Sequence, residues 1–294
     1  DDTFVLDMID DHYTTSHPYV PFIIGHLSDA VNLYHTNPKL YFVPKQNVLG
    51  RYNEAYGDEL YMIEERPHKS QKDVISFGNG GDIISTQDLL VNLEKDEKYR
   101  VDTEMYLRAR IFDFLIGDWD RHADQWRWAE KTKGDEVFYE PIPRDRDQAF
   151  AKLDGHLLRL LNKLPALRHM QHFSEDFAHP RWINKTAFPL DKVFLQNTQL
   201  SDWQHTAKQI ANDINDEVIT ETFNLLPEEI KEQYTQDIIH ILKARREKLV
   251  DFVETYYREL FKYGQVAGTN KKDTFIVKTA LDKVEVEHIR NKKS

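Results

Sequence analysis

The chain has 294 residues, with 39 lysines and arginines against 50 aspartates and glutamates, and a formal net charge of -11 at pH 7. This length can bury a large core, but the acidic balance lacks the basic surface that nucleic-acid binding requires, so we expect no nucleic-acid partner. The absence of cysteine excludes disulfide bonds, thiolate catalysis and zinc-thiolate sites. No stretch approaches the about 20 apolar residues of a membrane helix, so we expect no membrane span within the chain.

The first third of the chain mixes helix and strand signals. An amphipathic helix is predicted at the start, with Phe4 and Met8 among the apolar residues of one face. Two strands are predicted at residues 39–43 and 59–63, each bounded by proline and glycine signals.

The middle of the chain predicts two helices and a β-hairpin. Ser85 followed by Asp88 has the spacing of a capping box, which marks a helix start. Residues 100–116 carry an apolar side at helical spacing. Residues 126–130 and 136–141 read as two strands on either side of a Lys-Gly-Asp turn.

The last part of the chain reads as mainly helical, notably at 201–211 and 227–261. It ends in an alternating strand pattern with a turn near residues 281–283, which has little to pack on. Because the chain starts within a helix and ends in this hairpin, we expect it to be a fragment of a larger protein. Helices and strands together predict an α+β fold.

Two acidic clusters flank the predicted hairpin: GDWDRHADQW before it and PRDRDQAF after it. Antiparallel pairing would bring Asp120 and Asp124 to the end of the hairpin from which Asp145 and Asp147 leave. Carboxylates crowded in this way are costly unless a cation compensates their charge. The sequence therefore places the candidate site at this end of the hairpin.

The string LIGDWDRHADQ, residues 115–125, resembles the catalytic loop of the atypical kinases. This group includes the CotH spore-coat kinases, HipA-type kinases, phosphoinositide kinases and the secretory-pathway kinases that phosphorylate casein. The resemblance implies that Asp120 orients the acceptor hydroxyl, with Arg121 and His122 as its catalytic-loop partners, Arg121 fixing the loop by pairing with a carboxylate. It places a metal ligand at Gln125, where many members carry Asn or Glu.

The string DRDQAF, residues 145–150, resembles the Asp-x-Asp-x-x-Phe motif of CotH-type kinases. The resemblance implies that Asp145 is the first metal ligand here and Asp147 the second. MIEERP, residues 62–67, would take the place of the hinge, so that Glu64 and Glu65 bind the nucleotide through backbone groups. The implied cofactors are Mg²⁺ and ATP, and the implied activity is phosphoryl transfer to an unknown protein or small-molecule acceptor.

The resemblance implies a protein-kinase-like α+β fold in three segments. Residues 1–67 would form a partial small lobe and hinge, 68–265 a helical catalytic-type lobe, and 266–294 the start of a β segment. The sequence shows no glycine-rich phosphate loop and no lysine in the family's position. An inactive pseudokinase or structural module is therefore the first alternative, and a metal-dependent phosphoesterase is the second.

Residues 17–45, with EERP and GDWDRH, resemble a segment of large bacterial envelope proteins that combine a calcineurin-like phosphoesterase domain with a C-terminal outer-membrane barrel. This resemblance implies a location in the cell envelope, in the periplasm or at the outer membrane, with tethering through flanking domains.

Each motif also has a structural interpretation. GDWDRHADQW could be a surface turn whose aspartates cap helices and pair with Arg121 and Arg127. PRDRDQAF could be a charged turn in which Arg144 and Arg146 neutralise Asp145 and Asp147. His122 fits a structural imidazole that bonds the loop backbone.

Overall fold

The structure is a computed structural model that describes residues 19–71, 73–79, 81–153, 168–183, 185–264, 266, 268, 272–281 and 284–290. The predicted helix that contains Phe4 and Met8 lies outside the described residues. None of the described helices is both long and apolar enough to cross a membrane.

More of the described residues lie in helices than in strands, and the predicted α+β class is confirmed. The described helices are α2 (Val20–Ala30), α3 (Asn53–Tyr56), α4 (Thr86–Lys95), α5 (Thr103–Ile116), α7 (Pro180–Ile183), α8 (Phe188–Phe194), α9 (Leu200–Asp213), α10 (Asp216–Asn224) and α11 (Glu228–Leu260). The described strands are β1 (Lys39–Val43), β2 (Glu59–Ile63), β3 (Ile83–Ser85), β4 (Tyr99–Val101), β5 (Trp126–Lys133), β6 (Glu136–Pro143), β7 (Asp273–Thr279) and β8 (Val284–Arg290).

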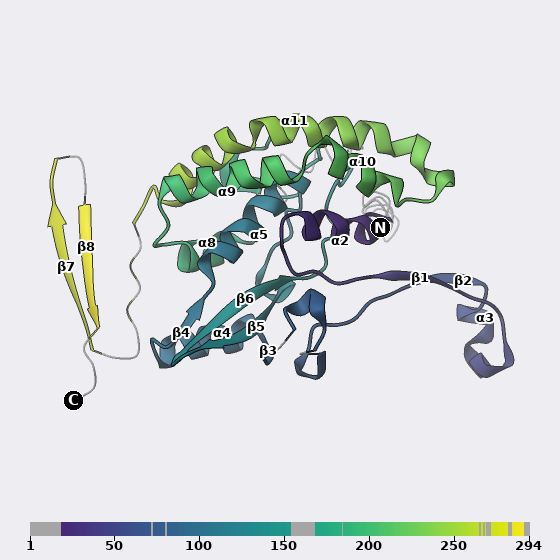
Figure 1. Ribbon diagram of the computed structural model, residues 1–294, viewed down its shortest axis with the longest axis horizontal. Coiled ribbons are helices and arrows are strands. Elements are labelled where there is room, and N and C mark those ends of the chain that lie inside the picture. Colours follow the sequence, from purple (N-terminus) through teal and green to yellow (C-terminus); the bar gives the residue numbers. More distant parts are fainter. Residues whose placement is uncertain are drawn as a thin grey trace, which may run out of the picture.

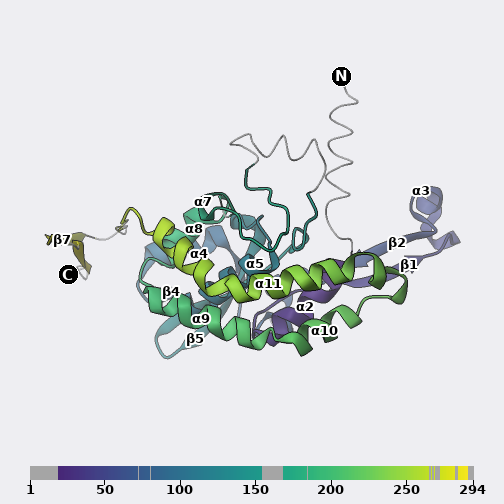
Figure 2. The same cartoon turned by 90° about the horizontal axis from the view of Figure 1, so that it is seen from above.

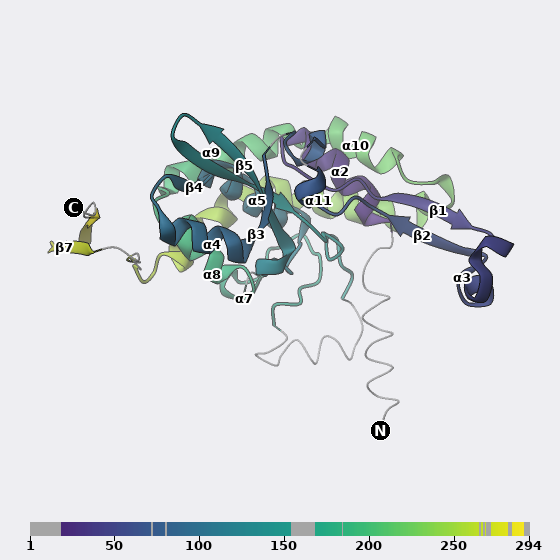
Figure 3. The ribbon, with the colours of Figure 1, turned by 90° about the horizontal axis from the view of Figure 1, so that it is seen from below.

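A four-stranded sheet in the order β3-β5-β6-β4 lies under the helices. Among its described strands, β4 and β6 pair in parallel, and the other neighbours pair antiparallel. Figure 1 shows α5 between this sheet and the outer helices α9 and α11, and Figure 3 shows α4 beside the sheet. Trp126 and Trp128 of β5 pack on Tyr106 of α5, with ring centroids 5.1 and 5.8 Å away. Ala129 and Ile142 belong to a smaller apolar cluster, so the sheet buries side chains on both faces.

Two β-hairpins extend from this body. β1 and β2 pair in the predicted strand positions, and the hairpin carries α3 at its tip, away from the helices (Figures 1 and 2). β7 and β8 pair around the predicted turn and stand apart from the other elements (Figure 1). Most side chains of both hairpins are exposed, so their strands are held mainly by backbone hydrogen bonds.

The predicted element boundaries need two corrections. The helix expected at 100–116 begins at Thr103, because Arg100 instead pairs with Phe138 in the parallel β4–β6 ladder. The strands of the central hairpin run three and two residues further than predicted, to Lys133 and Pro143. The capping box at Ser85 is confirmed, since its hydroxyl accepts a bond from the Asp88 amide at 3.1 Å.

Helix α5 is the centre of the fold, and every residue from Ala109 to Ile116 is buried. A helix that is buried all round must be covered on each side, here by the sheet and by α9 and α11. Its N-terminus is capped by the Asp102 carboxylate, which accepts a bond from the Met105 amide at 2.8 Å. Its C-terminus is capped by Arg245 of α11, which donates to the carbonyls of the last turn.

Gly117 ends α5 and opens the first acidic loop. Its φ of 75° is in the left-handed region, and a Cβ here would lie 2.7 Å from the Phe173 ring. Glycine is therefore required at this position for both backbone conformation and space.

Buried charges connect α5 to α8. Asp191 accepts hydrogen bonds from Arg110 Nε at 2.9 Å, from the Tyr106 hydroxyl at 2.8 Å and from the Tyr256 hydroxyl at 2.6 Å. Arg110 also donates from its Nη1 to Asp113 at 2.7 Å. The side chains of Arg110, Asp113 and Asp191 have no solvent exposure, so each charge depends on its partners.

We expect Asp191→Asn to lower the free energy of unfolding by about 3 kcal/mol or more, because it leaves part of the Arg110 charge buried without compensation. Urea denaturation of the wild type and the variant measures the difference. Asp176→Asn, which removes one partner of the exposed Lys248 pair, serves as the control and should cause no measurable change. Equal stability of wild type and Asp191→Asn would show that the network adds nothing to stability.

Candidate functional site

The two acidic motifs meet at one end of the β5–β6 hairpin. Trp126 pairs with Pro143 at the last position of the ladder, and the Arg144 amide donates to the Gln125 carbonyl at 2.9 Å. The expected juxtaposition of the two motifs is therefore observed. It follows directly from the register of the hairpin.

Arg121 binds both motifs through one buried guanidinium. Its Nε lies 3.2 Å from Asp118 Oδ2, within its own loop. Its Nη2 donates to the carbonyls of Arg144 at 2.6 Å and Asp145 at 2.9 Å, in the second motif. The guanidinium also lies over the Trp126 ring. We call this arrangement the Arg121 clamp, and it fixes the distance between the two loops.

Asp118, the carboxylate in the Arg121 clamp, is 2% exposed. Burial raises its pKa to about 7, with smaller increases from Asp113 and Asp147, while Arg121 and Arg146 oppose the rise. The loss of hydration thus outweighs the attraction of the two arginines.

Asp120 and His122 lie on the solvent side of the first loop. The Asp120 side chain is 29% exposed, and its Oδ2 is 3.8 Å from His122 Nε2. His122 Nδ1 accepts a bond from the Asp124 amide at 3.2 Å, so the imidazole caps the short 3₁₀ helix Ala123–Gln125. His122 therefore supports the loop backbone and faces Asp120 with its other nitrogen.

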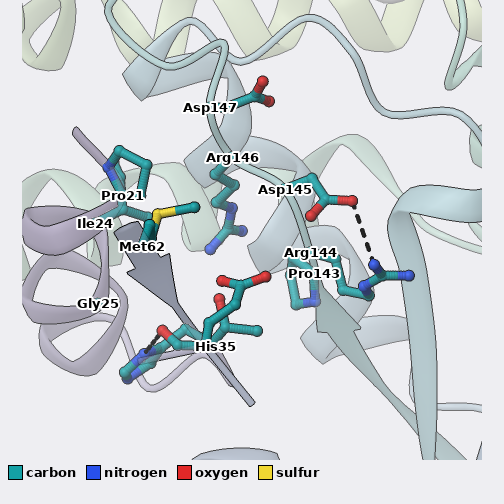
Figure 4. A pocket seen from close by; sticks show the side chains of 12 residues that line it. Pro21, Ile24, Gly25, His35, Met62, Pro143, Arg144, Asp145, Arg146 and Asp147 are labelled. Atoms are coloured by element: carbon teal, nitrogen blue, oxygen red, sulfur yellow. Dashed lines mark hydrogen bonds and ion pairs between the residues drawn. The ribbon is translucent and has the colours of Figure 1, made fainter. Parts of the chain in front are cut away.

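Arg146 anchors the second motif in the core. It donates from Nε to Asp113 at 3.1 Å and from Nη1 to the Ser28 hydroxyl of α2 at 3.0 Å. Figure 4 shows Arg146 between Asp145 on one side and the α2 residues Pro21 and Ile24 on the other. Of the two neutralising pairs expected in this motif, Arg144 with Asp145 is present at 3.5 Å, whereas Arg146 pairs with Asp113 and not with Asp147.

Asp113 and Asp118 belong to the site but are not predicted by either acidic motif. Asp113 stands between Phe112 and Phe114 in an apolar helix, and a charge in that setting signals a buried cationic partner. One partner is Arg110 of the same helix, whereas the other, Arg146, depends on tertiary packing. Asp118 is one of several aspartates in its loop, and its sequence context does not set it apart.

Asp145 and Glu64 line the same pocket, which has a volume of about 190 Å³. Its lining residues come from α2, from β2 and the stretches beside β1 and β2, and from the second acidic motif: Pro21, Ile24, Gly25, His35, Thr36, Met62, Glu64, Pro143, Arg144, Asp145, Arg146 and Asp147 (Figure 4). Burial raises the pKa of Glu64, and the nearby Asp145 charge adds to this effect. Glu65 has a buried carboxylate oxygen without a partner among the described residues.

The two aspartates of the second motif differ in setting. Asp145 has a left-handed backbone, with φ of 47°, and a side chain that is 39% exposed. Asp147 accepts a bond from the Gln148 amide group at 3.1 Å, and burial raises its pKa. Figure 4 shows the two carboxylates pointing in different directions.

The oxygen atoms at this end of the hairpin suit a magnesium ion that is shared with a phosphate. Magnesium typically takes one or two protein carboxylates, with water and substrate phosphates as its other ligands. Asp145 offers an accessible carboxylate, and Gln125 has a buried side-chain oxygen without a partner among the described residues. No three His, Cys, Asp or Glu side chains gather into a metal cage within the described ranges.

Two of the solved structures that are similar to the chain come from Helicobacter pylori and Shewanella oneidensis. The Helicobacter pylori proinflammatory kinase CtkA is 13% identical, with 82% of each chain covered and a TM-score of 0.46. HipA of the Shewanella oneidensis MR-1 toxin antitoxin system, in a complex with HipB and operator DNA, is 14% identical, with 80% of this chain covered and a TM-score of 0.43. The chain spans 56% of that HipA chain.

No protein-family model and no curated protein matches the sequence.

We expect Asp118→Asn to alter the pH dependence of stability. An unfolded aspartate titrates near pH 4, whereas the folded group titrates at about 7, so the folded state binds the extra proton between these values. The stability that Asp118 contributes is present below about pH 4 and lost as the pH rises through about 7. The variant cannot ionise at this position. Its free energy of unfolding relative to that of the wild type should therefore rise between about pH 4 and pH 8, by on the order of 1 kcal/mol or more.

Urea denaturation at several pH values measures this gain. Asp135→Asn, in the exposed turn at the other end of the hairpin, is the matched control and should follow the wild type at every pH. A constant difference between Asp118→Asn and wild type across the range would contradict the shifted pKa.

Proposed function

We propose that the chain is a protein-kinase-like module that transfers a phosphoryl group from a nucleotide, with magnesium as its cofactor. The observation that supports this most is the Arg121 clamp, which holds Asp120 and Asp145 in adjacent loops. Phosphoryl transfer depends on the position of acidic groups more than on covalent chemistry by the protein. Two hydrogen bonds from one buried guanidinium supply that positional control.

Each acidic residue has a proposed role. Asp120, on the open side of its loop, would accept a hydrogen bond from the acceptor hydroxyl and orient it. Asp145 and the Gln125 side-chain oxygen would hold magnesium, and Asp147 would assist. When bound, the metal would neutralise charge on the phosphate oxygens.

The nucleotide would extend beyond the pocket. Small-molecule sites typically measure roughly 300–1,000 Å³, so a pocket of about 190 Å³ holds only part of a nucleotide. We propose that Glu64 and Glu65 contact it through their backbone, as the hinge resemblance implies. Glu64 supports this role because it lies in the pocket beside Asp145.

A nucleotide-binding pseudokinase is the second candidate. Arg144 lies 3.5 Å from Asp145, so a metal would have to displace this cation from its main ligand. Gln125 also brings no charge to the metal, in contrast to the Glu of some related loops. A two-metal phosphoesterase would need several clustered ligands, for which the described residues give no support.

The envelope location and the tethering through flanking domains also stay proposals, supported by the resemblance of residues 17–45.

Magnesium at millimolar concentration should raise the melting temperature of the wild type, because a ligand that binds only the folded state stabilises it. A tenfold excess over Kd would add about 1.4 kcal/mol to the free energy of unfolding. Asp145→Asn should lose this gain, whereas Asp135→Asn in the opposite turn should keep it. Melting curves of wild type that do not respond to magnesium would rule out a metal site at Asp145.

Asp120→Ala should lower the rate of phosphoryl transfer by about 10²- to 10⁴-fold, because the acceptor hydroxyl loses its positioning group. Its affinity for ATP should stay within about twofold of wild type, since Asp120 is assigned to the acceptor. Transfer of labelled phosphate from ATP measures the first quantity and calorimetry the second, with Asp135→Ala as the control. A wild type that binds ATP without any transfer would identify the pseudokinase.

A further inference from the structure

Two arginines come from the same end of the central hairpin. Arg127 follows the first acidic loop on β5, and its Nη1 donates to the carbonyls of Asp124 at 3.1 Å and Trp126 at 2.7 Å. Its guanidinium therefore lies over the end of that loop. Arg144 follows β6, and its backbone is bonded to Gln125, two positions before Arg127.

A third arginine, Arg66, comes from a distant part of the sequence. Arg66 lies two residues after Glu64, which lines the pocket together with Arg144. Burial lowers the pKa of Arg127, and the charges of Arg144 and Arg66 lower it further. Arg127 is therefore within electrostatic reach of both Arg144 and Arg66. We call Arg66, Arg127 and Arg144 the arginine cluster.

The arginine cluster is poorly neutralised by the protein. Among the described residues, Arg66 and Arg127 form no ion pair. The charges of Asp124 and Asp145 raise the pKa of Arg127 by less than burial, Arg144 and Arg66 lower it. Arg144 is 15% exposed and has one ion pair, at 3.5 Å from Asp145. Its Nε is buried and has no acceptor among the residues that the structure describes. A buried donor without an acceptor is costly, so an added acceptor would be stabilising.

We propose that the arginine cluster binds a phosphate group at the rim of the pocket, an inference that rests on the proposed phosphotransferase function and names its phosphate contacts. Guanidinium groups present paired N–H donors that match phosphate oxygens. A phosphate would accept hydrogen bonds from guanidinium N–H groups of the cluster and would reduce the repulsion of Arg127 by Arg144 and Arg66. The phosphate belongs either to the nucleotide or to the acceptor, and both sources present the same chemistry.

Titration of the full chain with inorganic pyrophosphate in a calorimeter tests the arginine cluster without any turnover. Arg127→Gln and Arg144→Gln should each weaken binding about tenfold, because each removes charge-assisted hydrogen bonds. Arg66→Gln, which changes an exposed side chain and should not disturb folding, should weaken it by a smaller factor. Arg100→Gln on β4, away from the cluster, is the matched control and should bind like wild type.

Unchanged affinity in Arg127→Gln and Arg66→Gln, or an equal loss in Arg100→Gln, would overturn the proposal. Thermal melting of each variant shows whether it is folded. If Arg144→Gln does not fold, Arg66→Gln still tests the cluster. Wild type that binds pyrophosphate without transferring phosphate from ATP would support the cluster and count against the phosphotransferase function. The two failures are thus distinguishable.

ATP and adenosine separate the two sources of the phosphate. If the nucleotide supplies it, the cluster variants should lose about tenfold in ATP affinity and bind adenosine like wild type. If the acceptor supplies it, ATP affinity should be unchanged, and wild type saturated with ATP should still bind pyrophosphate. Each of these patterns supports the arginine cluster and assigns it to one source.

Discussion

A buried line of alternating charges runs from Asp191 through Arg110 and Asp113 to Arg146, and the candidate site depends on it. Two aspartates and two arginines balance in charge, which buried ionic groups require. The line starts in α8, crosses α5 and ends inside the second acidic motif. The backbone of that motif is thus fixed by buried residues of the helices α5 and α8 and not by the surface turn in which it lies.

The first acidic motif is then fixed to the second. Arg121 belongs to the first loop but donates to carbonyls of the second, so the position of one loop determines that of the other. The second motif is thus bound from both sides. Asp113 holds the Arg146 side chain, and Arg121 holds the carbonyls of Arg144 and Asp145. Neither contact uses the Asp145 carboxylate, which lines the pocket and lies 3.5 Å from Arg144. Preorganisation of this kind is what a site that acts by electrostatics requires.

The elements of the site were predictable from sequence wherever the signal is local. The alternation in residues 126–141 and the turn between them predicted the hairpin, and the hairpin alone brought the two motifs together. The partner of Arg146 was not predictable, because Asp113 is 33 residues away and only tertiary packing joins them. Arg100 was misassigned to a helix because a three-residue strand has too few residues to show alternation, and its pairing with β6 is not local.

The left-handed backbone of Asp145 limits which residues can occupy that position. A φ of 47° costs on the order of 1 kcal/mol for most side chains, but aspartate and asparagine tolerate it better, and glycine adopts it freely. Any other replacement would therefore combine the loss of a carboxylate with a shift of the loop that the Arg121 clamp holds. Asparagine is the replacement that isolates the charge, and natural variation at this position should be confined to aspartate, asparagine and glycine for as long as the loop keeps its shape.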